Sequence, residues 1–205
     1  LVDLLRLDHF RGLAGYWRVN GSSKTAICGK WINSPGKTLL NKLKIDLGTD
    51  YLPIIAEDLG VITPDVEKLR RNFKLPGMKI LQFAFDGNED NPYLPKNIEG
   101  ENWVVYTGTH DNSTSISWWE CLENNSKERI KDEYKFSENP SWSLIKIGME
   151  TNANLFIAPI QDILSLDDSS RLNTPGTTTN NWKWKINLPL DCLLYTSDAA
   201  DDANC

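Results

Sequence analysis

The sequence lacks the long apolar segments of membrane proteins. None of its apolar runs approaches the roughly 20 residues that a membrane-spanning helix needs. It begins with Leu1-Val2-Asp3 instead of a methionine followed by a basic segment, so we expect no signal peptide. Residues 2–8 already have the composition of a β-strand, which indicates that the sequence begins within a fold. We therefore predict no membrane partner.

The sequence is also poor in the residues that usually bind metals. It contains only two histidines, His9 and His110, and each stands next to an acid instead of in an H-x-H pattern. The four cysteines show no C-x-x-C spacing, so we expect free thiols in a reducing compartment; they are Cys28, Cys121, Cys192 and Cys205. We predict no metal and no other cofactor, with a metal hydrolase as the alternative.

An excess of basic charge is absent as well. The formal net charge is −6 and the pI is about 5.0, which argues against binding to nucleic acid. Four of the 28 acidic residues lie in residues 191–205, which contain no Lys or Arg, so residues 1–190 are nearly neutral. A nearly neutral domain suits an uncharged ligand. The low-complexity residues 191–205 are predicted to be a disordered tail that is not native sequence.

The hydrophobic pattern predicts an α/β fold. Apolar runs typical of buried parallel strands alternate with helical patterns, which favours a parallel sheet. Five strands are expected at residues 2–8, 52–57, 78–85, 104–107 and 155–160, and helices at residues 37–47, 64–73, 126–134 and 140–151. A closed (β/α)8 TIM barrel needs eight strands, so we expect a partial TIM barrel, its C-terminal portion of about strands 4–8, with the N-terminal strands missing. A complete open sheet of five strands is the alternative.

Acidic residues follow three of these strands directly. Arg6 and Asp8 stand two apart in a strand and should share one face, where the guanidinium favours the charged carboxylate. A charged carboxylate at a strand end could be a nucleophile toward a sugar carbon, or it could only fix a loop. Glu57 follows the next strand, and its longer side chain suits a general acid. A solvated acidic pair with Asp58 is the alternative.

The third acidic segment is Thr109-His110-Asp111-Asn112, and it follows a glycine. Gly108 allows the backbone to turn closely beneath a ligand, and the side chains of His110 and Asp111 can hydrogen-bond sugar hydroxyls. The carboxyl ends of barrel strands are where this fold places its chemistry. Two carboxylates on either side of one bond are the minimum needed to cleave a glycoside.

Six segments with these residues occur in a fixed order along the chain. The first three are Arg6-Leu7-Asp8-His9-Phe10-Arg11-Gly12, Ile55-Ala56-Glu57-Asp58-Leu59-Gly60 and Thr109-His110-Asp111-Asn112. The other three are Pro76-Gly77-Met78-Lys79-Ile80-Leu81-Gln82-Phe83-Ala84-Phe85, Ala158-Pro159-Ile160-Gln161-Asp162 and Asn173-Thr174-Pro175-Gly176-Thr177-Thr178. In these segments the chain resembles glycoside hydrolase family 77, the 4-α-glucanotransferases or amylomaltases. The resemblance covers residues 1 to about 188.

The resemblance implies a retaining transferase that moves segments of α-1,4-glucan (maltooligosaccharide, starch or glycogen chains) to an acceptor glucan or glucose. It implies that Asp8 is the nucleophile, Glu57 the acid/base and Asp111 the third catalytic carboxylate. Five residues are matched to substrate-binding positions: Arg6, His110, Asp58, Gln161 and Asn173. The sequence contains eight tryptophans that could stack on glucose rings, including Trp118, Trp119, Trp182 and Trp184.

The resemblance also implies where the chain belongs. Residues 1–190 would be the C-terminal part of a TIM-barrel glucanotransferase catalytic domain, which is inactive without the remaining strands, in the cytoplasm, or in the plastid of a photosynthetic eukaryote. Two alternatives stay open, a hydrolase of the wider α-amylase clan and a non-catalytic glucan-binding remnant. A phosphorylase is not expected, because no lysine lies in the context that binding pyridoxal phosphate requires.

Overall fold

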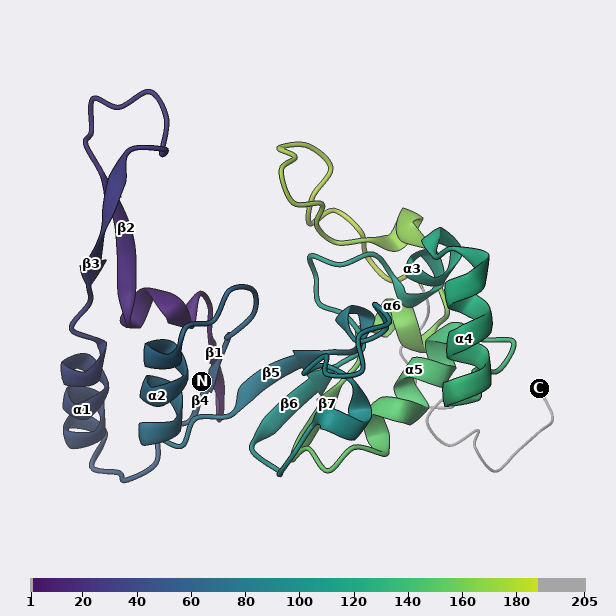
Figure 1. The fold of residues 1–205 in the computed structure, drawn as a ribbon, viewed down its shortest axis with the longest axis horizontal. Coiled ribbons are helices and arrows are strands. Elements are labelled where there is room, and N and C mark those ends of the chain that lie inside the picture. Colours follow the sequence, from purple (N-terminus) through teal and green to yellow (C-terminus); the bar gives the residue numbers. More distant parts are fainter. Residues whose placement is uncertain (1, 188–205) are drawn as a thin grey trace.

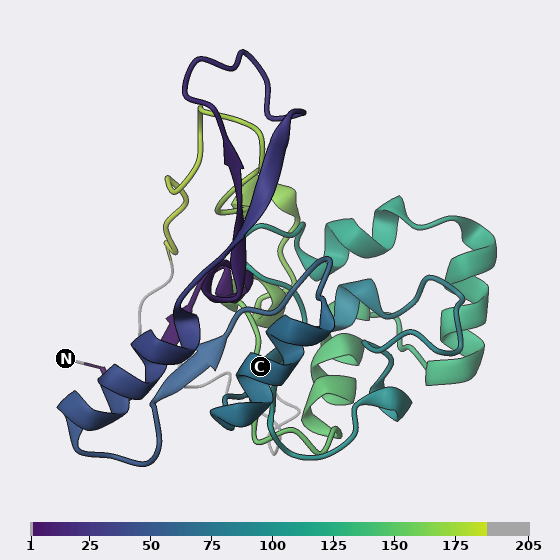
Figure 2. The same cartoon turned by 60° about the vertical axis from the view of Figure 1, so that its left-hand side comes forward.

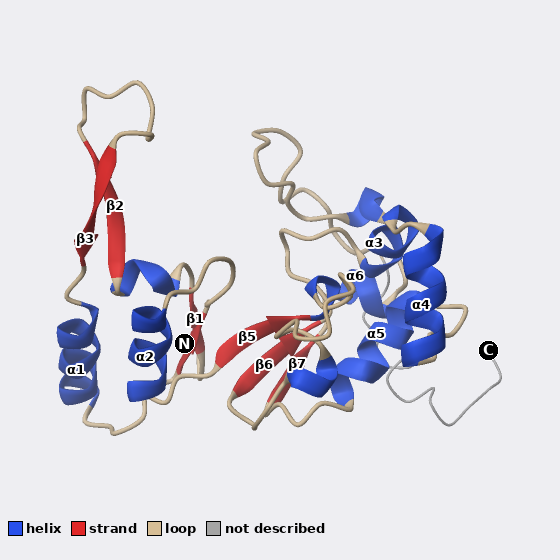
Figure 3. Cartoon of the chain, in the orientation of Figure 1, coloured by secondary structure: helices blue, strands red, loops and turns tan. Residues whose placement is uncertain are grey.

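The computed structural model of the protein describes residues 2–187, so the predicted tail at 191–205 lies outside the described residues. Strands and helices alternate along most of the chain, as Figures 1 and 3 show. Five strands are parallel: β1 (Leu5–Leu7), β4 (Ile54–Ala56), β5 (Gly77–Ile80), β6 (Trp103–Tyr106) and β7 (Leu155–Ile157). All five predicted strands are confirmed; β6 has the predicted length of four residues, shifted by one, and the other four strands are shorter than predicted.

The five strands lie in two small parallel sheets. One sheet pairs β1 with β4, and the other has the order β5-β6-β7. The two sheets meet between β4 and β5, where the Ala56 backbone N–H donates to the Pro76 carbonyl at 2.8 Å. The strands are therefore neighbours in chain order, and their carboxyl ends lie on the same side of the molecule.

The helices occupy the connections between these strands. They are α1 (Gly36–Leu47), α2 (Pro64–Asn72), α3 (Ser115–Cys121), α4 (Asn124–Tyr134), α5 (Pro140–Met149) and α6 (Ile160–Ile163). Four short 3-10 helices complete the connections: η1 (Phe10–Leu13), η2 (Leu81–Phe83), η3 (Pro95–Asn97) and η4 (Asp168–Ser170). The four predicted helices are confirmed as α1, α2, α4 and α5. The sequence analysis did not predict α3, α6 or the 3-10 helices.

Local signals explain where α1 ends and where α5 begins. Gly48 ends α1 with a φ of 61°, a left-handed conformation that glycine adopts without strain. The Asn139 side chain caps α5 by accepting from the backbone N–H groups of Ser141 and Trp142. Thr63 precedes α2 as predicted, but its hydroxyl does not cap the helix. It accepts a hydrogen bond from the Arg11 guanidinium at 3.1 Å instead.

An antiparallel hairpin interrupts the alternation of strands and helices. It consists of β2 (Gly15–Val19) and β3 (Gly29–Asn33), and it projects from the rest of the chain in Figures 1 and 2. Trp17 and Trp31 face each other across the two strands with their ring centroids 5.6 Å apart. Both rings are at least 40% exposed, so the hairpin contributes little to the core.

Buried apolar residues cover both faces of the strands. On the helix side, Ile54 and Ala56 of β4 pack with Leu40 of α1 and Val66 of α2. On the opposite side, the buried cluster contains Ile55, Met78, Ile80, Val104 and Tyr106. Strands that are buried on both faces need continuous apolar runs, which is the pattern that the sequence has.

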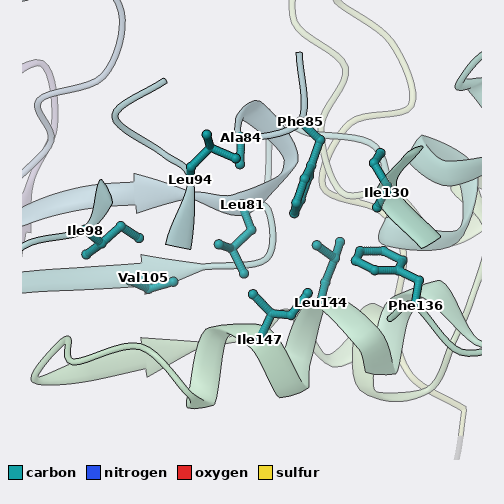
Figure 4. Packing of buried hydrophobic residues seen from close by; sticks show 10 residues of the cluster. All are labelled: Leu81, Ala84, Phe85, Leu94, Ile98, Val105, Ile130, Phe136, Leu144 and Ile147. Atoms are coloured by element: carbon teal, nitrogen blue, oxygen red, sulfur yellow. The ribbon is translucent and has the colours of Figure 1, made fainter. Parts of the chain in front are cut away.

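The largest cluster lies between the second sheet and α4 and α5 (Figure 4). Val105 of β6 and Leu81 meet Leu144 and Ile147 of α5, and Ile130 of α4 closes the end of the cluster. Four of these five side chains are at most 1% exposed. This packing fixes β6 and therefore the start of the segment that follows it.

Candidate active site

The first acidic segment lies at the carboxyl end of β1. Arg6 pairs with Ile55 of β4 in the sheet register, and its Nη2 contacts Asp8 Oδ1 at 2.8 Å. The prediction that Arg6 and Asp8 share a face is therefore confirmed. The Asp8 side chain is 75% exposed, whereas that of Arg6 is 30% exposed. The Asp8 carboxylate is thus accessible and is held by a guanidinium that is largely buried.

The second acidic segment lies beside the first. The Glu57 Oε2 atom accepts a hydrogen bond from the backbone N–H of His9 at 2.7 Å, and Oε1 accepts from that of Leu59 at 3.0 Å. The Glu57 backbone also pairs with the β1 side, donating to the Leu7 carbonyl and accepting from the Phe10 N–H. Because His9 directly follows Asp8, these contacts bring the Asp8 and Glu57 segments together.

His9 has the backbone conformation that this contact requires. Its φ is 49° and its ψ is 51°, a left-handed conformation that is uncommon for a side chain other than glycine. The turn places the N–H of His9 against the Glu57 carboxylate. The strained residue therefore lies between two predicted catalytic residues, where strained backbone is often found.

The third acidic segment follows β6. The Asp111 Oδ1 atom accepts a hydrogen bond from Asn173 Nδ2 at 2.6 Å, and His110 Nε2 lies 3.4 Å from the same oxygen. The His110 ring lies against the Trp182 ring at a tilt of 37°, with a centroid separation of 5.2 Å. The structure thus brings together three of the predicted site residues, and Trp182 joins them as an exposed aromatic face.

A cavity of about 70 Å³ lies next to this third segment. Its lining includes Thr109, His110, Gln161 and Arg171. Gln161 is 4% exposed and donates from Nε2 to the Ser170 carbonyl at 3.1 Å. Gln161 is therefore close to His110, as a shared site requires, but its amide is already bound within the protein.

The Asp8–Glu57 group and the Asp111 group lie on different sheets. Among residues 2–187, no hydrogen bond or ion pair joins them directly. The two sheets are connected by packing, because Ile55 of β4 lies in the same buried cluster as Tyr106, the last residue of β6. Arg6 pairs with Ile55 in the sheet register, and paired residues of neighbouring strands point to the same face.

Asp58 does not lie with the other predicted substrate-binding residues. Its side chain is 8% exposed, contacts Arg70 of α2 at 2.9 Å and accepts from the Met78 backbone N–H at 2.8 Å. Successive residues of an extended segment point to opposite faces, so Asp58 points away from Glu57. The alternative of a solvated acidic pair is therefore wrong, and the substrate-binding role of Asp58 stays a prediction that its contacts do not favour.

The sequence analysis missed two residues that hold the third segment in place. Arg171 donates from Nη2 to the Asp111 carbonyl at 2.6 Å and from Nη1 to Ser113 Oγ at 3.1 Å. The buried Asp162 accepts from the Thr107 hydroxyl and from the Ser115 backbone N–H. Asp162 lies in α6, within the segment Ala158-Pro159-Ile160-Gln161-Asp162 that supports the resemblance, although no role was predicted for it. No pattern in the sequence indicated Arg171.

Two further predictions concern tryptophans and metals. Trp118 and Trp119 are partly buried against the cluster of Figure 4, so they support the core. Within residues 2–187, no group of three or more His, Cys, Asp or Glu side chains could hold a metal ion. In the same part of the chain, no helix is long and apolar enough to cross a membrane.

Comparison with known proteins adds independent information. A family model described as 4-alpha-glucanotransferase, glycoside hydrolase family 77, matches residues 1–191. The chain is 47% identical over 186 residues to the 4-alpha-glucanotransferase of Synechocystis, covering 90% of the chain and 37% of that protein. It is 43% identical over 194 residues to the 4-alpha-glucanotransferase of Thermus thermophilus, covering 91% of the chain and 38% of that protein.

A plant relative gives the same result. The chain is 47% identical over 206 residues to 4-alpha-glucanotransferase DPE1, chloroplastic/amyloplastic, of Arabidopsis thaliana, covering 98% of the chain and 35% of that protein. The chain therefore spans little more than a third of the length of the curated relatives that it matches.

The fold is similar to that of solved amylomaltases. The structure of the amylomaltase from Streptococcus agalactiae in complex with acarbose matches with a TM-score of 0.86 and 33% identity. That match covers 97% of the chain and 41% of the other protein. The amylomaltase from Corynebacterium glutamicum matches at a TM-score of 0.65 over 88% of the chain and 31% of that protein, but at 17% identity it supports the fold alone.

Proposed function

The chain belongs to the 4-alpha-glucanotransferase family, glycoside hydrolase family 77, and we propose that it carries the catalytic carboxylates of a retaining α-1,4-glucan transferase. The observation that carries the proposal is the hydrogen bond from the His9 N–H to the Glu57 carboxylate. It ties the segment of the exposed, Arg6-paired Asp8 to the second acid. Two carboxylates about 5–5.5 Å apart are what a retaining mechanism requires.

In the first half of the reaction, Glu57 donates its proton to the glycosidic oxygen of the donor glucan. An Asp8 oxygen attacks the anomeric carbon as the bond to that oxygen breaks, which leaves a covalent glycosyl–Asp8 ester and a shortened glucan. The Arg6 guanidinium contacts Asp8 Oδ1 at 2.8 Å and holds the carboxylate in place for this attack.

In the second half, Glu57 acts as a base. It takes the proton from the 4-hydroxyl of an acceptor glucan or glucose, whose oxygen attacks the anomeric carbon and releases Asp8. Two inversions retain the α configuration. Asp111, oriented by Asn173 and flanked by His110, binds the sugar hydroxyls, and Trp182 offers a ring for stacking.

The proposal also includes the context of the chain. The parallel strands with helices on one side are consistent with part of a (β/α)8 barrel, with residues 1–190 as one part of a larger catalytic domain. The partners would be α-1,4-glucans, with no nucleic acid and no membrane. A cytoplasmic location, or a plastid one as in the chloroplastic/amyloplastic Arabidopsis relative, would suit this substrate.

The test incubates the complete protein that carries these residues with maltotriose. Transfer redistributes chain lengths while the total number of reducing ends stays constant. An increase in reducing ends would instead identify a hydrolase of the α-amylase clan. Glucan binding without either change would identify a non-catalytic protein.

Two variants assign the roles in that assay. Asp8→Asn should lower the rate of redistribution by roughly three orders of magnitude or more, because the nucleophile is lost. Glu57→Gln should slow glucan donors to a similar degree. The 205-residue chain alone should be inactive. Normal redistribution by Asp8→Asn would show that the nucleophile is another residue.

A further inference from the structure

Asp58, the residue that follows Glu57, forms a buried charged pair with Arg70 of α2. The side chains of Asp58 and Arg70 are 8% and 5% exposed, and Asp58 Oδ2 lies 2.9 Å from Arg70 Nε. That N–H is not aligned for a hydrogen bond, so the contact is an ion pair. The other oxygen, Oδ1, accepts from the Met78 backbone N–H at 2.8 Å. Asp58 thus joins the end of β4 to both α2 and β5.

One further cation, Lys79, and the aromatic rings of Trp103 and Tyr93 lie around this pair. The Arg70 guanidinium lies 4.3 Å from the centre of the Trp103 ring, and Lys79 Nζ lies 4.2 Å from the same ring. Lys79 also lies 5.2 Å from the Tyr93 ring. Burial raises the pKa of Asp58 and of Tyr93 and lowers the pKa of Lys79, as expected for groups with little access to water.

Gly77 leaves the space that Asp58 occupies. A Cβ atom at Gly77 would lie 2.5 Å from Asp58 Oδ2 and 2.6 Å from the Trp103 ring. Burying a carboxylate and a guanidinium together is often no more stabilising than an apolar pair of the same shape. Stability alone is therefore a weak reason for a charged pair at this place.

The geometry connects the pair to the acid/base residue. The peptide that follows Asp58 carries the Leu59 N–H, which binds Glu57 Oε1 at 3.0 Å. On the β1 side the Glu57 backbone is fixed by Leu7 and Phe10. On the β5 side, the Ala56 N–H bond to the Pro76 carbonyl holds the backbone before Glu57, and the contacts of Asp58 to Arg70 and Met78 hold the backbone after it.

We infer that Asp58 is a positioning residue for Glu57, held by Arg70 and by the Met78 N–H in what we term the Asp58 anchor. The inference rests on the proposed function, because it assumes that Glu57 is the general acid. A general acid must be within hydrogen-bond reach of the leaving oxygen, and a displacement of about 1 Å can lower the rate roughly a hundredfold. The anchor prevents that displacement by fixing the peptide that holds the carboxylate.

The test uses two donors that differ in their need for an acid. A maltooligosaccharide donor needs a proton on its leaving oxygen, whereas α-maltosyl fluoride releases fluoride without one. With the complete protein, steady-state kcat and KM are measured for the maltooligosaccharide donor, and the first-turnover release of fluoride is measured for α-maltosyl fluoride. Glu57→Gln is the reference and should slow the glucan donor far more than fluoride release.

Three variants loosen the Asp58 anchor: Asp58→Asn, which keeps an acceptor for Met78, Arg70→Met, and Gly77→Ala. Each should lower kcat for the glucan donor about 10- to 100-fold with KM within roughly threefold. The first-turnover release of fluoride should stay within roughly threefold of the wild-type rate. Gly21→Ala is the matched control, because a Cβ there would meet nothing within 4 Å. It should leave both donors unchanged.

The double variant Asp58→Asn/Arg70→Met guards against misfolding, since it removes both charges of the pair and leaves neither one buried without the other. It should unfold like the wild type and still show the donor difference. Equal losses with both donors, or no loss with either, would overturn the inference while the proposed function stands. If Glu57→Gln itself slows both donors equally, the proposed role of Glu57 fails and the inference fails with it.

Discussion

Arg171 connects the Asp111 segment to the segment that carries Asn173, so its replacement tests how the third carboxylate is held. Its guanidinium donates to the Asp111 carbonyl at 2.6 Å, to the Asn173 carbonyl at 2.9 Å and to Ser113 Oγ at 3.1 Å. A contact with Asp168 at 3.4 Å adds a partly exposed ion pair. Arg171→Met removes all four contacts and keeps much of the side-chain volume.

The expected loss follows from these contacts. Each hydrogen bond contributes about 1 kcal/mol net, and the ion pair with the partly exposed Asp168 contributes less than about 1 kcal/mol. The Arg171 side chain is 20% exposed, so water can replace part of what is lost. We expect Arg171→Met to lower the free energy of unfolding by about 2–3 kcal/mol. A loosened Asp111 should also lower kcat/KM for glucan transfer roughly tenfold, which corresponds to about 1.4 kcal/mol.

Stability is measured by urea unfolding of the complete protein, monitored by tryptophan fluorescence. Activity is measured by the redistribution of maltotriose. Arg129→Met is the control, because Arg129 donates one hydrogen bond, at 2.9 Å, to the Phe85 carbonyl, away from Asp111. The control should lose about 1 kcal/mol and keep full activity. If Arg171→Met matched this control in both stability and activity, the reasoning about the third segment would be refuted.

The remaining predictions concern residues that pack in the core and the titration of Tyr134, and each is checked by urea unfolding. Leu144 is fully buried in the largest cluster, so Leu144→Ala should lower the free energy of unfolding by about 2–5 kcal/mol. Leu39 lies on the exposed side of α1, so Leu39→Ala should lower it by less than about 1 kcal/mol. Equal losses would contradict the packing. Gly148→Ala places a Cβ 2.1 Å from the Phe156 ring. It should therefore destabilise the protein by about 1–3 kcal/mol, although alanine has the higher helix propensity. A stabilised variant would contradict the close approach of α5 to β7. Burial raises the pKa of the Tyr134 hydroxyl from 10.0 to about 12. Between these two pH values the unfolded chain releases the hydroxyl proton while the folded protein keeps it, so the free energy of unfolding should fall as the pH rises from the lower value to the higher. Tyr134→Phe should reduce this fall, and identical pH slopes for both proteins would argue against the burial.

The fold was predictable wherever a residue faces a core. The runs that became β4, β5 and β6 are buried on both faces and therefore continuous in sequence. The hairpin of β2 and β3 was missed because it lies outside the core, so burial imposes no apolar pattern on it. The seven-residue α3 was missed for a related reason: it is short, and its two tryptophans gave no clear helical stripe.

The site was predictable where one strand determines it. Arg6 lies in β1 and Asp8 directly follows that strand, two residues after Arg6, and the alternation of side chains along an extended segment predicts their contact. The position of Asp58 follows from the same geometry, but its partner Arg70 comes from another element and no local pattern indicates it. Arg171 was missed because its contacts reach back about 60 residues, to the segment that follows β6.

The covalent intermediate gives the most direct test of the account. The complete protein is incubated with a fluorinated α-glucosyl fluoride that forms the glycosyl ester but releases it slowly, and the digested protein is analysed by mass spectrometry. The account predicts one added sugar on the peptide that contains Asp8, attached to that carboxylate, and none in Asp8→Asn. A sugar on a different carboxylate, or a first product of inverted configuration with no adduct, would contradict it.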